Sequence, residues 1–103
     1  MAGGMQQMLK QANQMQSRMK KIQEELKQKT YSAKAGGDAV CVSVSGEYLL
    51  SKISIQDELF KDADSETLQD LIIIASNEAI KAAKKDSETQ MNQVTGGAMP
   101  GLF

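Results

Sequence analysis

The side chains best suited to chemistry in this sequence are cations, and they concentrate toward both ends of the chain. Residues 1–34 carry seven Lys or Arg against two acids, a net charge of +5. Residues 35–80 carry two against nine (−7), and residues 81–103 carry three against two (+1). Because Lys and Arg attract anionic groups such as phosphate, this asymmetry indicates an anionic partner for the basic segments. The candidate binding residues are Lys10, Arg18, Lys20, Lys21, Lys27, Lys81, Lys84 and Lys85.

The same cations also have a simpler interpretation as the solvated surface of two helices. Glu24 lies three or four residues from Lys20, Lys21 and Lys27, and opposite charges at these spacings support a helix. The lysines at 81–85 fall toward the C-terminal end of a predicted helix, where positive charge interacts favourably with the helix dipole. Charge alone leaves both interpretations open.

Several classes of active site are excluded by what the sequence lacks. It contains no histidine, which removes Ser–His and Cys–His nucleophile pairs and ordinary zinc sites. It also contains no glycine-rich phosphate loop. Hydrolysis by two carboxylates is formally possible, but no spacing points to a particular pair. The sequence therefore predicts that the protein is not an enzyme. It predicts no metal, no other cofactor and no small-molecule substrate.

Most of the first group of cations belongs to one predicted helix at residues 5–29, which carries an apolar stripe with heptad spacing. Steps of four and three residues separate its members, and a mean period of 3.5 keeps such a stripe facing a partner helix. At about 1.5 Å per residue the helix is too long to lie wholly on so small a core, so part of it should project. The alternative is an amphipathic helix packed on its own sheet. The predicted dimer seam consists of Met8, Ala12, Met15, Met19 and Ile22.

Three strands follow, and short turns join them into an antiparallel meander. The middle one is the clearest, because Val40, Val42 and Val44 alternate with small or polar residues. Cys41, the lone cysteine, should pack on this strand as a small residue. In the third strand the face containing Leu49 also holds Ser51, Ile53 and Ile55. The predicted strands span 30–35, 39–45 and 48–55.

A second long helix completes an α+β fold. A polar linker at 56–63, which Leu59 and Phe60 should anchor, leads to an N-cap at Asp64 or Ser65, and the helix extends to about Met91. Its bulky first half should cover the sheet, and its alanine-lined second half should project or pack on another helix. Asn77 in this helix is either a buried polar contact or exposed. The predicted organisation is one domain at 1–94, of which residues 1–4 form a flexible lead, followed by a disordered tail at 95–103.

The sequence contains no candidate for a membrane span or a signal segment. Its longest fully apolar run covers residues 71–75, far short of the ~20 residues that cross a bilayer. A lone cysteine cannot form an internal disulfide, which is typical of a reducing compartment. These features predict a cytoplasmic protein without a membrane partner.

Two segments carry a resemblance to a known family. The stretches KQANQMQSRMKKIQEEL in the first helix and LQDLIIIASNEAIKAA in the second resemble the YbaB/EbfC family of bacterial nucleoid-associated proteins, and the likeness extends over nearly the whole chain. The resemblance implies a homodimer with a shared β core and projecting helical arms that grip double-stranded DNA, and a location in the nucleoid. One departure is that family members often carry Arg where this chain has Lys81, Lys84 and Lys85. Lysine retains phosphate attraction but lacks the planar fork that reads bases.

Two functions from different classes follow. The first is an architectural or regulatory DNA-binding protein that contacts phosphates through its basic arms and has little sequence preference. The acidic middle segment and the net charge of −1 favour modest affinity. The alternative is a protein-interaction module, an adaptor or chaperone, that uses the Met-rich heptad helix to hold a partner helix.

Overall fold

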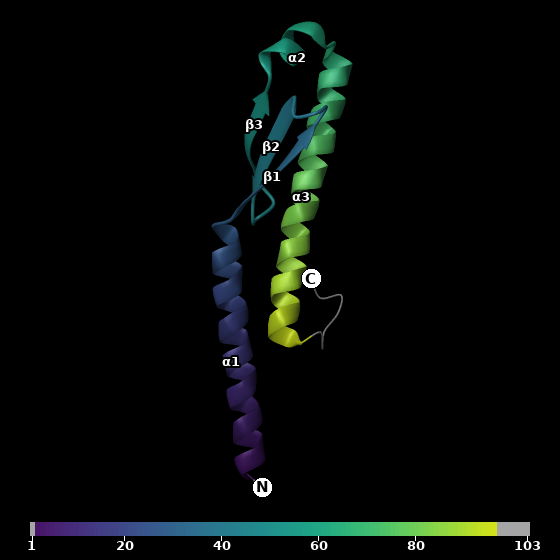
Figure 1. The fold of residues 1–103 in the computed structure, drawn as a ribbon. Helices are drawn as coiled ribbons and strands as arrows, with labels where there is room; N and C mark the ends of the chain where they lie inside the picture. The colour runs from purple at the N-terminus through teal and green to yellow at the C-terminus, as the bar shows by residue number, and fades with distance from the viewer. Residues whose placement is uncertain (1, 97–103) are drawn as a thin grey trace.

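The computed structural model describes residues 2–96 as two long helices that flank a small sheet (Figure 1). This order confirms the predicted α+β fold. The molecule is elongated, with principal extents of 74 × 21 × 16 Å. The elements are α1 (Ala2–Lys27), β1 (Thr30–Ala35), β2 (Val40–Ser45), β3 (Leu50–Ile55), α2 (Asp57–Asp62) and α3 (Ser65–Thr95).

The sheet is the predicted antiparallel meander, with strand order β1-β2-β3. Its pairing is irregular between Ser43 and Val44, because Leu50 lies opposite Val44 where a regular ladder would place Ser51. Ile53 and Ile55 lie opposite Val42 and Val40, as members of the predicted face, whereas Leu49 lies outside the strand. In the β2–β3 turn Tyr48 adopts a left-handed backbone conformation (φ 66°), and β3 begins at Leu50, two residues later than predicted.

The core lies between β2 and the alanine-lined face of α3. Val40, Val42 and Val44 are completely buried, as is Ala79 on the helix. Alanine lets the helix approach the strand closely, and burial of each valine contributes about 1.5–3 kcal/mol. The alanine-lined second half of α3 was expected to project or pack on another helix; Ala79 and Ala83 share the core with the sheet, and this half of the helix also packs on α1.

Covering is uneven across the sheet, because α3 lies over β1 and β2 and leaves β3 largely uncovered. Ile53 pairs with Val42 and so points to the same side of the sheet, yet 45% of its surface is exposed. Leu50 is 48% exposed. An apolar edge of this kind is unusual for a small soluble domain.

Helix α3 begins and ends with clear capping groups. The Asp64 side chain accepts a hydrogen bond from the main-chain N–H of Thr67 at 2.7 Å, which confirms the predicted N-cap. The helix continues to Thr95, beyond the predicted end near Met91, because no helix-breaking residue occurs before Gly96. That glycine caps the helix in a left-handed conformation (φ 63°). Of the predicted disordered tail, Thr95 is thus helical, and residues 97–103 lie outside the described part of the chain.

The segment expected to be a linker contains a short helix, α2. Asp57 and Glu58 occupy its first turn and Lys61 its last turn, the arrangement that the helix dipole favours. None of its residues is buried, so the sequence has no apolar period that would reveal it. Leu59 packs against the core as expected, whereas Phe60 is 67% exposed and does not anchor the segment.

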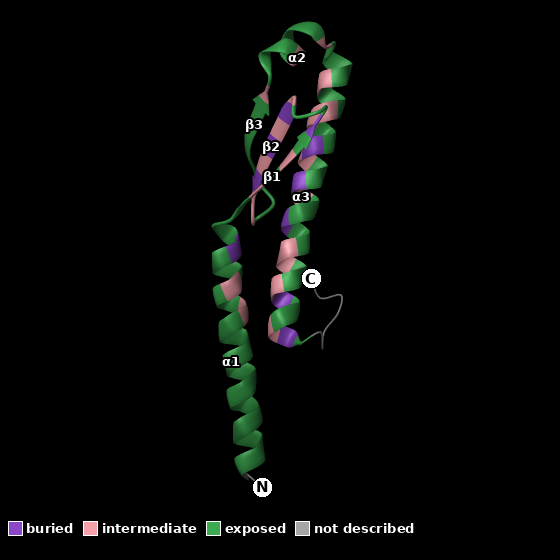
Figure 2. Ribbon diagram, in the orientation of Figure 1, coloured by how far each residue is buried: buried purple, intermediate pink, exposed green. Residues whose placement is uncertain are grey.

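Helix α1 packs against the C-terminal half of α3 and extends beyond the end of that helix (Figure 1). It begins at Ala2, so the predicted flexible lead is helical from that residue on. Burial is confined to its C-terminal end, where Leu26 is buried and Met19 and Ile22 are half-buried (Figure 2). The expected projection of part of this helix is confirmed, and the alternative of packing on its own sheet is wrong.

Candidate nucleic-acid interface

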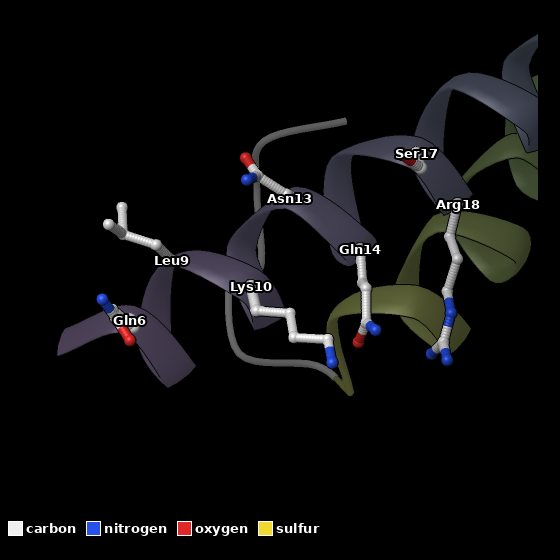
Figure 3. A pocket seen from close by; sticks show the side chains of 7 residues that line it. All are labelled: Gln6, Leu9, Lys10, Asn13, Gln14, Ser17 and Arg18. Atoms are coloured by element: carbon white, nitrogen blue, oxygen red, sulfur yellow. The ribbon is translucent and has the colours of Figure 1, made fainter. Parts of the chain in front are cut away.

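The cations of α1 occupy an exposed helix surface. Lys10 lies at the heptad position opposite the methionine stripe, and Arg18 lies on a flank of the same face. Figure 3 shows Lys10, Gln14 and Arg18 pointing to one side of the helix, at a spacing of four residues. No acidic residue occurs in the sequence before Glu24, so nothing on this half of α1 neutralises the two cations.

A shallow hollow runs along this face, and six of its seven lining residues have polar or charged side chains, although carbon atoms form most of its surface (Figure 3). Amide and hydroxyl groups between the two cations can donate and accept hydrogen bonds. The lining residues are Gln6, Leu9, Lys10, Asn13, Gln14, Ser17 and Arg18.

The other predicted cations of α1 lie closer to the sheet. Lys20, Lys21 and Lys27 are exposed. Lys27 lies in the last turn of the helix, where its charge also interacts favourably with the helix dipole. Cations therefore occur along α1 from its projecting half to its junction with β1, with the exposed acids Glu24 and Glu25 between Lys21 and Lys27.

On α3 the three predicted lysines have different surroundings. Lys81 forms an ion pair with Glu78 at 3.4 Å, and both side chains are largely exposed. The Nζ atom of Lys84 lies 5.7 Å from the centre of the Tyr48 ring, a cation–π contact with the β2–β3 turn. Lys85 is exposed. These three lysines belong to α3, whereas the other predicted cations belong to α1.

The residues of the predicted seam are divided between two environments. Met19 and Ile22 are half-buried where α1 meets α3 of the same chain. Met8 is 70% exposed, and Ala12 and Met15 are also exposed. The projecting half of the stripe thus has no cover within residues 2–96, and its use as a dimer seam stays a prediction.

A polar cluster that the sequence did not reveal joins the α1–β1 junction to α3. Asp86 Oδ2 accepts hydrogen bonds from Lys29 Nζ at 2.9 Å and from the Tyr31 hydroxyl at 2.5 Å. The bond from Tyr31, followed by that from Lys29, holds the pKa of Asp86 below its ordinary value. Burial, followed by the bond to Asp86, raises the pKa of Tyr31. More than fifty residues separate Asp86 from both partners, so no local spacing could have predicted the cluster.

Other candidate sites are weak. Cys41 is half-buried on β2, in agreement with a packing role, and Asn77 is exposed on α3. Within residues 2–96 no group of three potential ligands could hold a metal ion. None of the described helices combines the length and apolar character needed to cross a bilayer.

The chain is similar over nearly its whole length to proteins described as nucleoid-associated. A nucleoid-associated protein of Clostridium novyi is 42% identical to it, in an alignment that covers 100% of this chain and 93% of the relative. A nucleoid-associated protein of Acetivibrio thermocellus is 43% identical, with 98% and 91% covered. Among solved structures, an uncharacterized protein of Helicobacter pylori superposes with a TM-score of 0.64 at 27% identity, covering 76% of this chain and 82% of that one. The family model for YbaB/EbfC DNA-binding proteins matches residues 1–99, and the chain belongs to this family.

Proposed function

We propose that this protein binds double-stranded DNA in the bacterial nucleoid, as a homodimer that contacts phosphates through its basic helices. The observation that carries the proposal is the exposed positive face of α1, which contains no acid before Glu24, in a chain of a DNA-binding family. The names of the relatives from Clostridium novyi and Acetivibrio thermocellus support the nucleoid as the location.

Binding proceeds by charge more than by base recognition. Lys10, Arg18, Lys20, Lys21 and Lys27 of α1 displace counterions from the phosphate backbone, and the affinity falls with salt at a log–log slope of about −0.9 per phosphate neutralised. The lysines of α3 contribute a second and weaker surface, because Lys81 is paired with an acid.

The acidic part of the chain keeps the duplex on the helices. Residues 35–80 carry a net charge of −7 and include β2, β3, α2 and the first half of α3. Repulsion between these acids and phosphates confines DNA to the surfaces where the cations lie.

A second copy of the chain supplies the cover that the sheet and α1 lack. Leu50 and Ile53 leave an apolar edge on β3, and Ile73 and Ile74 on α3 are more than half exposed. Exposed apolar side chains of this kind are typical of a protein interface. A twofold axis doubles each basic surface and places the two copies of α1 in symmetric positions on the duplex.

One observation favours the alternative function. Met5 and Met8 are 72% and 70% exposed in the projecting half of α1, and flexible methionine side chains suit the binding of varied partner helices. An adaptor that uses this stripe would bind a protein helix and would have no need of the positive face opposite.

Fluorescence anisotropy on several unrelated duplexes at two salt concentrations tests the proposal. The Lys20→Glu/Lys21→Glu variant should bind every duplex more weakly, with a flatter salt dependence than the wild type. The matched control is Lys52→Glu/Lys61→Glu, which changes the net charge equally on exposed residues of β3 and α2. Equal weakening by both variants would show that only net charge matters, and absence of salt-sensitive binding by the wild type would favour the adaptor.

A further inference from the structure

The link between α1 and β1 is only two residues long, Gln28 and Lys29, and α3 holds it through one carboxylate. Asp86 Oδ2 accepts from Lys29 Nζ at 2.9 Å and from the Tyr31 hydroxyl on β1 at 2.5 Å. The second oxygen, Oδ1, accepts from Gln90 Nε2 at 3.4 Å, which ties the carboxylate to its own helix. A single side chain of α3 therefore binds both the link and the strand that follows it.

The Asp86 cluster is more buried than an ordinary surface ion pair, so we expect it to contribute more to stability. The Asp86 side chain retains 25% of its accessible surface, against 56% for Glu78 in the ion pair with Lys81. Three donors surround the Asp86 carboxylate, and their charge and hydrogen bonds favour its ionised form. The Lys81–Glu78 pair joins residues of one helix, whereas the Asp86 cluster joins α3 to β1 and to the link that precedes it.

The β2–β3 turn holds the same link from another side. The main-chain N–H of Gly46 donates to the carbonyl of Lys29 at 3.2 Å. A Cβ atom at Gly46 would collide with the main-chain carbonyl of Leu26 in the last turn of α1. The turn approaches the helix this closely only because residue 46 has no side chain.

We propose that Asp86, Tyr31, Lys29 and the Gly46 contact together form an arm lock, which fixes the direction of α1 relative to α3 and so the spacing at which the cations of α1 meet DNA. These are positioning residues, and they need not contact the duplex. The part of the inference that concerns DNA rests on the proposed function, and the part that concerns the direction of α1 does not.

The length of α1 makes a small change at the link important. Lys10 lies 19 residues before Lys29, a distance of about 28 Å along a helix. A rotation of about 10° at the link would move Lys10 by about 5 Å, which exceeds the ~3.4 Å rise between successive phosphates of one DNA strand. Cations at the end of a loosely held helix would therefore miss the phosphates that a fixed helix could contact together.

Distances between spin labels on the two helices test the lock without DNA. Nitroxides at Gln16→Cys and Gln93→Cys, both exposed positions, with Cys41→Ser in the background, report the direction of α1 relative to α3. Dilution with unlabelled protein restricts the signal to one chain. We expect a narrow distance distribution in the parent protein and a broader or displaced one in the Asp86→Asn variant.

The matched control is Glu78→Gln, which removes one negative charge from the same helix and breaks an ion pair that joins no second element. Its distance distribution should equal that of the parent. Tyr31→Phe, which keeps the ring but removes the hydroxyl, should broaden the distribution as Asp86→Asn does. Unchanged distributions in both lock variants would overturn the proposal.

DNA affinity distinguishes an effect of charge from an effect of positioning, because the two change it in opposite directions. Loss of an acid strengthens phosphate attraction, so Glu78→Gln should bind duplexes as tightly as the wild type or more tightly. The lock predicts weaker binding by Asp86→Asn despite the same change in charge, and a log–log salt slope smaller by about 0.9 for each phosphate that the variant no longer neutralises. Asp86→Asn binding as tightly as Glu78→Gln would overturn the part of the inference that concerns DNA.

A variant at Gly46 tests the lock without altering any charge. Gly46→Ala should displace α1 from its carbonyl contact and weaken DNA binding while leaving every cation in place. Should this variant not fold, Asp86→Asn and Tyr31→Phe still decide the matter. If the wild type binds no duplex, the proposed function fails, and the label distances alone decide whether these residues fix the direction of α1.

Discussion

Lys84 lies over the ring of Tyr48, with its Nζ atom 5.7 Å from the ring centre. The contact joins α3 to the β2–β3 turn, in which Tyr48 has a left-handed backbone conformation. One lysine predicted to bind DNA therefore also takes part in holding the fold together. Its neighbour Lys85 is exposed and has no such contact within residues 2–96.

Because only Lys84 contacts the ring, substitutions of the two lysines should differ in their effect on stability. Lys84→Gln and Lys85→Gln remove equal charge and should reduce the salt slope of DNA binding by similar amounts. Only Lys84→Gln should also lower the free energy of unfolding, by about 0.5–1 kcal/mol, the usual contribution of an exposed cation–π contact. Urea denaturation of both variants measures this; equal stabilities would show that the ring contact contributes nothing.

Val42 is the most informative position in the core. It is completely buried between β2 and the alanines of α3, so Val42→Ala removes two methyl groups and leaves a cavity that the close-packed helix cannot fill. We expect a loss of about 2 kcal/mol or more. Thermal unfolding followed by circular dichroism measures it, with Ser54→Ala on the exposed strand β3 as a control that should change little.

The oligomeric state can be tested at Ala12, which is exposed in the chain and belongs to the predicted seam. We expect the wild type to have twice the 11.2 kDa mass of the chain and Ala12→Glu to weaken that dimer. Ile53→Lys should weaken it through the uncovered edge of β3. Light scattering at tens of micromolar decides between the surfaces, and a dimer unaffected by Ala12→Glu would show that the seam is not used.

Acid should weaken the fold through Asp86. Its pKa is held below the ordinary value of 3.8 by hydrogen bonds from Tyr31 and then Lys29. A lowered pKa in the folded state contributes stability above the unfolded value, and this contribution disappears as the pH falls through the folded value. The wild type should therefore lose more free energy of unfolding than Asp86→Asn when the pH falls from 5 toward 2. Asp64, whose pKa is also lowered, titrates in both proteins.

Urea titrations at a series of pH values provide the measurement. At neutral pH the variant should be less stable than the wild type, and the two curves should converge in acid. Parallel curves over the whole range would show that the carboxylate of Asp86 contributes no stability that depends on its ionisation.

The parts of the fold that the sequence predicted are those with a strong local signal. Alternation around Val42 predicted β2, and Asp64 predicted the start of α3 through its capping side chain. Helix α2 was missed because six residues with none buried produce no period. The start of β3 was predicted two residues too early, at Tyr48, because a positive φ is rare for a non-glycine residue and nothing in the sequence indicated it.

The candidate site was predictable in its charges but not in its contacts. The exposure of Lys10 and Arg18 follows from the helix period, and the absence of acids before Glu24 leaves their charge without a neighbour of opposite sign on the same half of the helix. The heptad spacing gave no indication that Met19 and Ile22 would meet α3 of the same chain while Met8 remained exposed. The pairing of Asp86 with Lys29 depends on tertiary structure, since 57 residues separate the two.

The projecting half of α1 has a consequence for the dynamics of the free protein. A helix without tertiary cover is held only by its own hydrogen bonds, and isolated helices shorter than about 12–15 residues are marginal in water. Amide hydrogen exchange in α1 should therefore be slow near Leu26, which is buried, and become progressively faster toward Met5. Local opening of this segment leaves the sheet intact, so a duplex or a second chain that binds it must also order it. The entropy of that ordering reduces the affinity, and slowed exchange at the N-terminal amides would identify the residues that the partner covers.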